Sequence, residues 1–372
     1  MAVSTGSSLY SLSVLEPSDI FRLLVMTVNT WWGCFLEKKN TSIGGHVYMD
    51  TSLMDPDQEH ENQNCTNPQI GLALLKRTLT AQLTIAEALN VTVDPIIADM
   101  ASHLPPFAVW ECDASGSKNL QSGATCKPGS KLWTQCGTGS MTRFGDDTIH
   151  ASDGYSLYPL FPAEVVNVFT SSEAELEIAR NSVAYYTGIG DPYSNETVKS
   201  CLSNMVHTFS MMERAGWPAN ITLPYLKQFL ELQRADFVPS LNSIGSGMTE
   251  RLGISLAVVD MLVQAPTSTY IVLFPAWDLA EDAAFADLLV KGAVRVSASW
   301  SAKRQTVFGV SVVVSSEHRG LVVIRKQLGM GDNWKVVRCA DGMRPAVHST
   351  SELFSFAAPA GVRCTIGTPT LD

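Results

Sequence analysis

One carboxylate in the sequence stands where acid–base chemistry could use it. Gly245 and Gly247 form a Gly-rich turn, and Glu250 follows it at the start of an apolar helix. The neighbouring Arg251 would hold Glu250 ionised, which suits a general base. The helix dipole also favours an acidic residue at this position, so a plain N-terminal helix charge is the alternative interpretation.

A second group of carboxylates lies in the loop 55–68, DPDQEHENQNCTNP, just before a predicted helix. Glu61 is the first candidate for a partner of Glu250, and Glu59 is the second. His60 between them could orient a carboxyl group or a sugar hydroxyl. Inverting hydrolysis of a glycosidic bond requires an acid and a base on carboxyls about 6.5–9.5 Å apart. A solvated acidic loop without chemistry is the alternative interpretation.

Aromatic rings near the predicted helix ends could stack on the apolar face of a sugar ring. Tyr155 and Tyr158 lie in the best such segment, YSLYPLFP, and Trp217 lies between two predicted helices. Trp110 and Trp277 are further candidates. For each ring, a place in the core or at its rim is the commoner role.

Other chemistries find less support in the sequence. The seven histidines are scattered, and neither Cys-x-x-Cys nor His-Glu-x-x-His occurs. We therefore predict no metal site and no cofactor. Residues 188–191 lack the strand and helix of a nucleotide-binding turn, and residues 243–247 lack the strand that precedes a nucleophile elbow.

Helical spacing of apolar residues predicts the elements that would position these side chains. The predicted helices cover residues 9–38, 67–89, 95–103, 171–186, 195–214 and 223–234, and another follows Gly247. They succeed one another through short loops, a pattern typical of antiparallel helical hairpins. We therefore expect a mainly α fold with a β tail, in which residues 1–275 form a partial (α/α)6 toroid of helical hairpins.

The period of the sequence changes after Pro275. Residues 294–300 and 310–314 alternate valine with other side chains, which predicts antiparallel strands. Residues 278–293 are expected to form a connector with a short helix. Residues 276–372 are therefore predicted to form a small antiparallel β-sandwich-like domain.

Cysteines and glycosylation motifs indicate the secretory pathway. The chain has eight cysteines, and Asn-x-Ser/Thr motifs begin at Asn40, Asn64, Asn90, Asn195 and Asn220. We expect one disulfide between two of Cys112, Cys126 and Cys136, and another between Cys339 and Cys364. The prediction is a secreted, disulfide-bonded glycoprotein. Since the first residues lack the basic region of a signal peptide, we expect the true N-terminus to lie elsewhere.

Charge and hydropathy argue against two classes of partner. The formal net charge is −10 and the pI is about 5.2, and the sequence shows no basic stripe for nucleic acid. The apolar runs are shorter than the roughly 18 residues that a membrane span needs. We expect neither a nucleic acid nor a membrane as partner, and the sequence leaves the oligomeric state open.

Residues 243–277 resemble the last barrel helix and the following strand in the catalytic unit of glycoside hydrolase family 95, a family of six-hairpin glycosidases. In that family an acid-bearing, Gly-rich turn leads into a helix with a Met-Leu-Leu-Gln-like end, then an apolar strand and a Pro-Ala segment. Here these parts read Gly245–Glu250, Met261–Gln264 and Leu273–Trp277. Residues 67–110 and 157–180 are similar to the same unit.

The resemblance implies a hydrolase that acts on a glycan substrate. Its reaction would be inverting hydrolysis of α-linked fucose or a related galacto-configured sugar, without a cofactor. Glu61 would be the general acid and Glu250 the general base. The sequence departs from the family pattern, because the base site is often an Asp where this chain reads Met248–Arg251. The family's pair of water-positioning asparagines and its N-terminal β domain also have no counterpart. The chain therefore resembles the C-terminal part of a longer enzyme, and activity is implied with the missing N-terminal part in place.

Two other functions stay open at this stage. A truncated, non-catalytic remnant, or a glycan-binding protein, would keep the fold without a working acid pair. A polysaccharide lyase would need a His–Tyr centre for proton abstraction, and His46 or His60 near Tyr155 would have to supply it.

Overall fold

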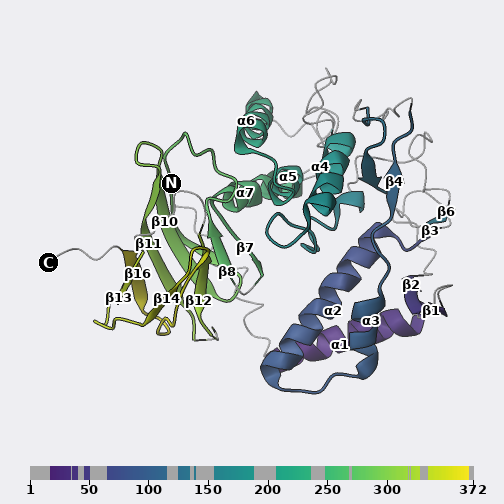
Figure 1. Cartoon of the computed structure of the whole chain (residues 1–372), viewed down its shortest axis with the longest axis horizontal. Helices are drawn as coiled ribbons and strands as arrows, with labels where there is room; N and C mark the ends of the chain where they lie inside the picture. Colours follow the sequence, from purple (N-terminus) through teal and green to yellow (C-terminus); the bar gives the residue numbers. More distant parts are fainter. Residues whose placement is uncertain are drawn as a thin grey trace. The chain divides into compact units, whose positions relative to one another are not determined.

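The computed structural model describes residues 17–34, 36–40, 46–50, 65–114, 125–134, 138–139, 155–187, 207–235, 248–267, 270–316, 318, 320–326 and 334–367. The chain divides into two compact units (Figure 1). Unit 1 comprises Met1–Val166 and Glu177–Tyr186, and unit 2 comprises Asn167–Leu176 and Thr187–Asp372. The two units therefore share the helix α4 (Glu173–Thr187).

Unit 1 combines helices with short pairs of strands. Its helices are α1 (Pro17–Cys34), α2 (Gln69–Leu89) and α3 (Pro95–His103), with the 3-10 turn η4 (Tyr155–Leu157). Its strands pair antiparallel as β1 (Leu36–Asn40) with β2 (His46–Asp50), β3 (Cys65–Thr66) with β6 (Thr138–Gly139), and β4 (Val109–Glu111) with β5 (Lys131–Trp133). Figure 1 shows α1, α2 and α3 side by side.

The sequence explains the bounds of α2 and α3. Pro68 precedes α2 and Asn90 ends it in the left-handed conformation, where the cap N–H donates back to the helix. Asp94 caps α3 by accepting a 3.0 Å hydrogen bond from the N–H of Ile96. Both helices confirm the predicted ranges. Their inner faces join a small core of Val28, Tyr48, Leu75, Leu79, Ile97 and Met100.

Unit 2 contains a β-sandwich. One sheet, here the β10 sheet, has the order β13-β16-β11-β10-β9, and the other, the β8 sheet, has the order β14-β15-β12-β8-β7. The β10 sheet consists of β9 (Ala283–Val290), β10 (Val294–Ser301), β11 (Thr306–Val314), β13 (Val336–Cys339) and β16 (Arg363–Gly367). The β8 sheet consists of β7 (Val263–Thr267), β8 (Tyr270–Leu273), β12 (Val322–Arg325), β14 (Val347–Ser349) and β15 (Leu353–Phe356).

One hydrophobic core joins the inner faces of the two sheets. Val296 and Val312 of the β10 sheet are fully buried in it, as are Ile324 and Phe354 of the β8 sheet. The alternation predicted for β10 and β11 is confirmed, because Val296 of β10 and Val312 of β11 point into the core. The β8 sheet is mixed, since β8 and β12 run parallel.

Unit 2 also contains the helices α5 (Thr208–Arg214), α6 (Ala219–Ala235) and α7 (Met248–Leu262). Pro224 lies inside α6. α7 passes directly into β7, so the sandwich begins before residue 276.

Two disulfides confirm the expected bridges. Cys112 joins Cys126 in unit 1, and Cys339 joins Cys364 in unit 2. The second bridge links directly paired residues of β13 and β16. Among the described helices, none combines the length and hydropathy needed to cross a membrane.

The prediction of a mainly α fold with a partial (α/α)6 toroid is wrong. The described residues form sixteen strands beside seven helices, and ten of those strands build two large sheets. Periodicity identified single helices correctly, but a toroid needs helical hairpins repeated around a ring, and short strand pairs separate several of these helices. The short helix expected within residues 278–293 is also wrong, since this segment holds β9.

Candidate functional site

The predicted acidic loop lies outside the described residues. Glu59, His60 and Glu61 all belong to this loop. Tyr155 begins η4 with its side chain outside the description, and Tyr158 in the following turn is half-buried. All these positions belong to unit 1.

The other predicted site residues belong to unit 2. Glu250 and Arg251 lie in the first turn of α7, and their side chains are outside the described part. Trp217 follows α5 and is half-buried, and its indole Nε1 is buried without a hydrogen-bond partner among the residues that the structure describes. The structure therefore places Trp217, Glu250 and Arg251 on neighbouring segments of one unit, because α5 packs against α7.

A polar cluster that the sequence analysis missed lies at this packing. Every residue of α5 is buried, including the charged pair Glu213 and Arg214. A helix of seven residues with no exposed side chain is unusual for a segment that carries ionisable groups, since Glu and Arg are rarely buried without partners. The cluster consists of His207, Glu213, Arg214, Trp217 and Asp260, and we call it the α5 cluster.

Arg214 and Asp260 form a buried ion pair within the α5 cluster. The guanidinium Nη2 lies 3.0 Å from Asp260 Oδ2, and Nε donates a 3.1 Å hydrogen bond to the same oxygen. The two side chains are 9% and 7% exposed. Burial raises the pKa of Asp260, while the charge of Arg214 opposes that rise. The pair ties α5 to the last turn of α7.

Glu213, next to this pair, has no such partner among the described residues. Its residue is 1% exposed, and within that part of the chain both carboxyl oxygens are buried without a hydrogen bond. Burial raises the pKa of Glu213 well above its ordinary value, and the nearby charge of Asp260 raises it further. The protonated form of Glu213 is therefore favoured over a wider pH range than for an exposed glutamate.

His207 precedes α5 and is the remaining ionisable residue of the α5 cluster. Burial lowers the pKa of His207, and the positive charge of Arg214 lowers it further. The imidazole is therefore neutral at neutral pH. The cluster thus combines two groups whose pKa values burial shifts in opposite directions, His207 and Glu213, with the ion pair of Arg214 and Asp260.

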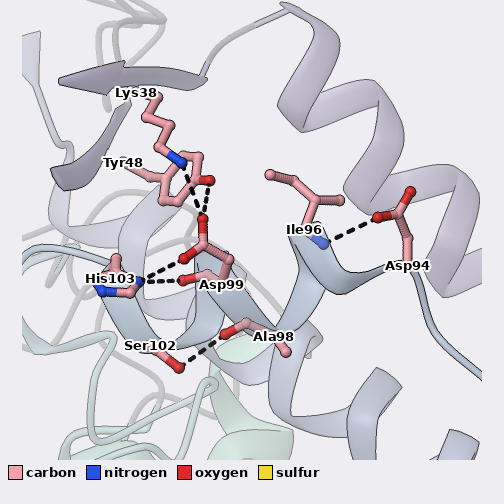
Figure 2. A network of polar contacts seen from close by, with 8 residues as sticks. All are labelled: Lys38, Tyr48, Asp94, Ile96, Ala98, Asp99, Ser102 and His103. Carbon is pink, nitrogen blue, oxygen red and sulfur yellow. Dashed lines mark hydrogen bonds and ion pairs between the residues drawn. The ribbon is translucent and has the colours of Figure 1, made fainter. Parts of the chain in front are cut away.

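A second polar network lies in unit 1 around Asp99 of α3 (Figure 2). Its carboxyl Oδ2 accepts a 2.5 Å hydrogen bond from the Tyr48 hydroxyl and a 3.2 Å one from Lys38 Nζ. Oδ1 lies 3.0 Å from His103 Nδ1. Lys38 is on β1 and Tyr48 on β2, so the network joins this hairpin to α3. We call it the Asp99 network.

The protonation states in the Asp99 network argue against an activated nucleophile. Burial alone lowers the pKa of Lys38, but its hydrogen bonds to Asp99 and Tyr48 outweigh this and raise the pKa. Burial raises the pKa of Tyr48, and the hydrogen bond to Asp99 adds to the rise. Lys38 therefore stays a cation and Tyr48 stays a neutral phenol, as expected of a network that holds β1, β2 and α3 together.

One sequence signal could have identified the α5 cluster. Asp260 interrupts the apolar run GISLAVVDML of α7. A single acid inside an otherwise apolar helix predicts a buried partner, because an unpaired buried charge is costly. The sequence does not say that the partner is Arg214, which lies 46 residues away.

Neither a metal centre nor a known relative adds to this site. Within the part of the chain that the structure describes, no group of three or more His, Cys, Asp or Glu side chains is placed to hold a metal ion. No protein-family model matches the chain, and no curated protein matches it.

Proposed function

We propose that this chain is a secreted O-glycosyl hydrolase that cleaves α-linked fucose or a related galacto-configured sugar with inversion. Glu250 would act as general base and Glu61, or its neighbour Glu59, as general acid. His60, Tyr155, Tyr158, Trp217 and Arg251 would contact the sugar. The reaction needs these carboxyls about 6.5–9.5 Å apart across the bond.

The succession α7, β7, β8 is the observation that carries the proposal. Residues 248–273 form a helix, then strands, and Pro275 and Ala276 follow directly. The same order of elements is expected from the resemblance to family 95 glycoside hydrolases. In it Glu250 occupies the first turn of a helix, where a base can face a substrate at the helix end.

The α5 cluster supports the same proposal. A general base must keep its position within a fraction of an ångström, which requires a fixed supporting helix. Arg214 holds α7 through Asp260, and Gln264 Nε2 donates a 3.0 Å hydrogen bond to the Asp260 carbonyl. The helix that carries Glu250 is thus anchored at its other end.

Two features support secretion. The disulfides Cys112–Cys126 and Cys339–Cys364 are typical of proteins from oxidising compartments. The glycosylation motif at Asn90 lies on the surface, since Asn90, Val91 and Thr92 are all exposed. Absence of a glycan at Asn90 in protein from its natural source would count against secretion.

Hydrolysis of aryl glycosides tests the proposal. Purified full chain should release the aryl group from α-fucosides or galacto-configured glycosides, and Glu250→Gln should lower kcat by about a hundredfold or more, as loss of acid–base catalysis does. Glu173→Gln is the matched control, because Glu173 also lies in the first turn of a helix in unit 2. Equal loss in both variants, or activity unchanged in Glu250→Gln, would contradict the assignment.

The same experiment separates hydrolysis from glycan binding. If the chain binds fucosylated glycans but releases no sugar, the non-catalytic alternative holds. The variants Glu61→Gln and Glu59→Gln distinguish the two candidates for the general acid. An aryl leaving group with a low pKa needs little protonation by that acid. Loss of the acid should therefore slow natural glycosides more than activated aryl glycosides.

A further inference from the structure

The outer face of the β10 sheet carries a cluster of cations on an acidic protein. In this sheet, residues paired directly across strands point to the same side. Arg295 pairs with Val313, and Val313 pairs with Arg363, so the two arginines share one row. The adjacent row contains Ser297, Ser311, Thr365 and Arg338. All three arginines are exposed, while the protein as a whole has a net charge of −10.

Two of these arginines converge on one acid. Arg363 Nη2 lies 2.8 Å from Asp287 Oδ1, and Arg295 Nη1 donates a 3.4 Å hydrogen bond to the Asp287 carbonyl. Arg363 Nη1 also donates to Ser311 Oγ at 3.0 Å. The side chains of Arg363 and Asp287 are 46% and 48% exposed. The guanidinium groups are therefore held in place and still face water.

The cluster has donors to spare. A guanidinium offers several N–H groups in a fixed fork, and these contacts occupy a minority of those on Arg295 and Arg363. Asp287 compensates one of the two charges. Arg295 and Arg363 together therefore keep one positive charge in excess of Asp287, which favours an anion with two oxygens, such as a carboxylate or sulfate, and Arg338 lies in the adjacent row.

An apolar platform lies on the same face. Phe308 pairs with Ser299, which points outward two residues beyond Ser297, and Phe308 is 47% exposed. The row of Arg295 and the row of Ser299 are about 13 Å apart along β10 at ~3.3 Å per residue. That length exceeds one sugar ring, and an exposed ring can stack on the apolar face of a pyranose.

From these observations we infer that the outer face of the β10 sheet binds an acidic polysaccharide. The acid groups of the sugar pair with Arg295, Arg363 and Arg338, and a neighbouring ring rests on Phe308. This binding function is separate from the proposed hydrolysis, because it uses neither Glu250 nor Glu61. It would hold the protein on an acidic glycan matrix.

Affinity electrophoresis of the full chain tests the inference. The chain should be retarded by polygalacturonate and not by neutral dextran, and added salt should weaken the retardation because these charges are exposed. Arg295→Gln combined with Arg338→Gln should raise the Kd about tenfold or more, as expected for lost charge-assisted hydrogen bonds. Arg304→Gln, in the exposed turn after β10, is the matched control.

Two further measurements decide the kind of ligand. Phe308→Ala should weaken binding of polygalacturonate without changing the melting temperature. Equal retardation by a single-stranded oligonucleotide, or loss of binding in Arg304→Gln to the same degree, would overturn the inference in favour of a general polyanion surface. No retardation by polygalacturonate would overturn it outright. None of these outcomes depends on glycosidase activity.

Discussion

Asp99 in unit 1 and Glu213 in unit 2 show two ways in which this protein places a carboxyl group. Asp99 is 28% exposed, and its oxygens contact Tyr48, Lys38 and His103. Glu213 is buried, and its oxygens have no hydrogen-bond partner in the described part of the chain. The first environment supplies hydrogen-bond donors to the carboxyl group, and the second raises the pKa of the acid.

The two carboxyl groups differ in what surrounds them. Tyr48 and Lys38 donate hydrogen bonds to the Asp99 carboxyl. Burial and the nearby charge of Asp260 instead raise the pKa of Glu213. A polar network thus stabilises one carboxyl group in unit 1, whereas burial shifts the pKa of another in unit 2.

Breaking the buried ion pair should have the largest effect. Asp260→Ala leaves Arg214 charged and buried, which should lower the free energy of unfolding by about 3–5 kcal/mol. Urea denaturation followed by tryptophan fluorescence measures this. The double variant Arg214→Met with Asp260→Leu is the control, since it removes both charges and should recover most of the loss. A single variant as stable as the parent would show that the pair is not buried.

The pH dependence of stability should sharpen the comparison next. The folded pKa of Glu213 lies above its unfolded value, so the native state binds the extra proton between those two values. Its stabilising contribution is complete below about pH 4.3 and is lost as pH rises towards the folded pKa, by up to about 1.4 kcal/mol per pH unit. Glu213→Gln should therefore gain stability relative to the parent as pH rises.

Urea denaturation at pH 5, 6, 7 and 8 measures this difference. Glu175→Gln is the control, because Glu175 is an exposed residue of α4 in the same unit. Parallel pH profiles for the parent and Glu213→Gln would mean that Glu213 is hydrated, and the contrast with Asp99 would disappear.

Removing the hydroxyl of Tyr48 should have a smaller effect. Tyr48 is fully buried and donates to an ionised carboxylate, so Tyr48→Phe should cost about 1.5 kcal/mol. Hydrogen exchange of α3 amides, which measures local opening in unit 1, should accelerate accordingly. If exchange accelerates only in unit 2, the network does not join the hairpin to α3.

The smallest effect is expected at Lys38. Its side chain is 43% exposed, and exposed ion pairs contribute little to stability because solvent screens them. Lys38→Met should therefore change the melting temperature slightly, and less at high salt. A loss larger than that of Tyr48→Phe would show that the charge of Lys38, rather than the phenol, holds the network.

Local chemistry predicted several elements well. The helical spacing of apolar residues predicts α2, and the valine alternation predicts β10 and β11. The pairing of Cys339 with Cys364 was also predicted, although their direct register across β13 and β16 comes from the structure. These features depend on a few neighbouring residues, which is why sequence reasoning reaches them.

Features set by distant contacts were missed. β9 reads AAFADLLV, whose Ala and Leu content favours helix, and a bulge near Asp287 interrupts the alternation that would indicate a strand. The toroid failed because single helices do not determine how they assemble. The α5 cluster was missed because its burial depends on α6 and α7, which no local pattern in α5 reports.

The enclosed position of α5 has a consequence for how the protein forms during synthesis. Arg214 reaches its partner Asp260 across 46 residues of chain. Before α7 docks onto α5, Glu213 and Arg214 lack one of the helices that bury them. Because burial raises the pKa of Glu213, docking of α7 is coupled to uptake of a proton, so acidic conditions favour the docked state more than neutral conditions do.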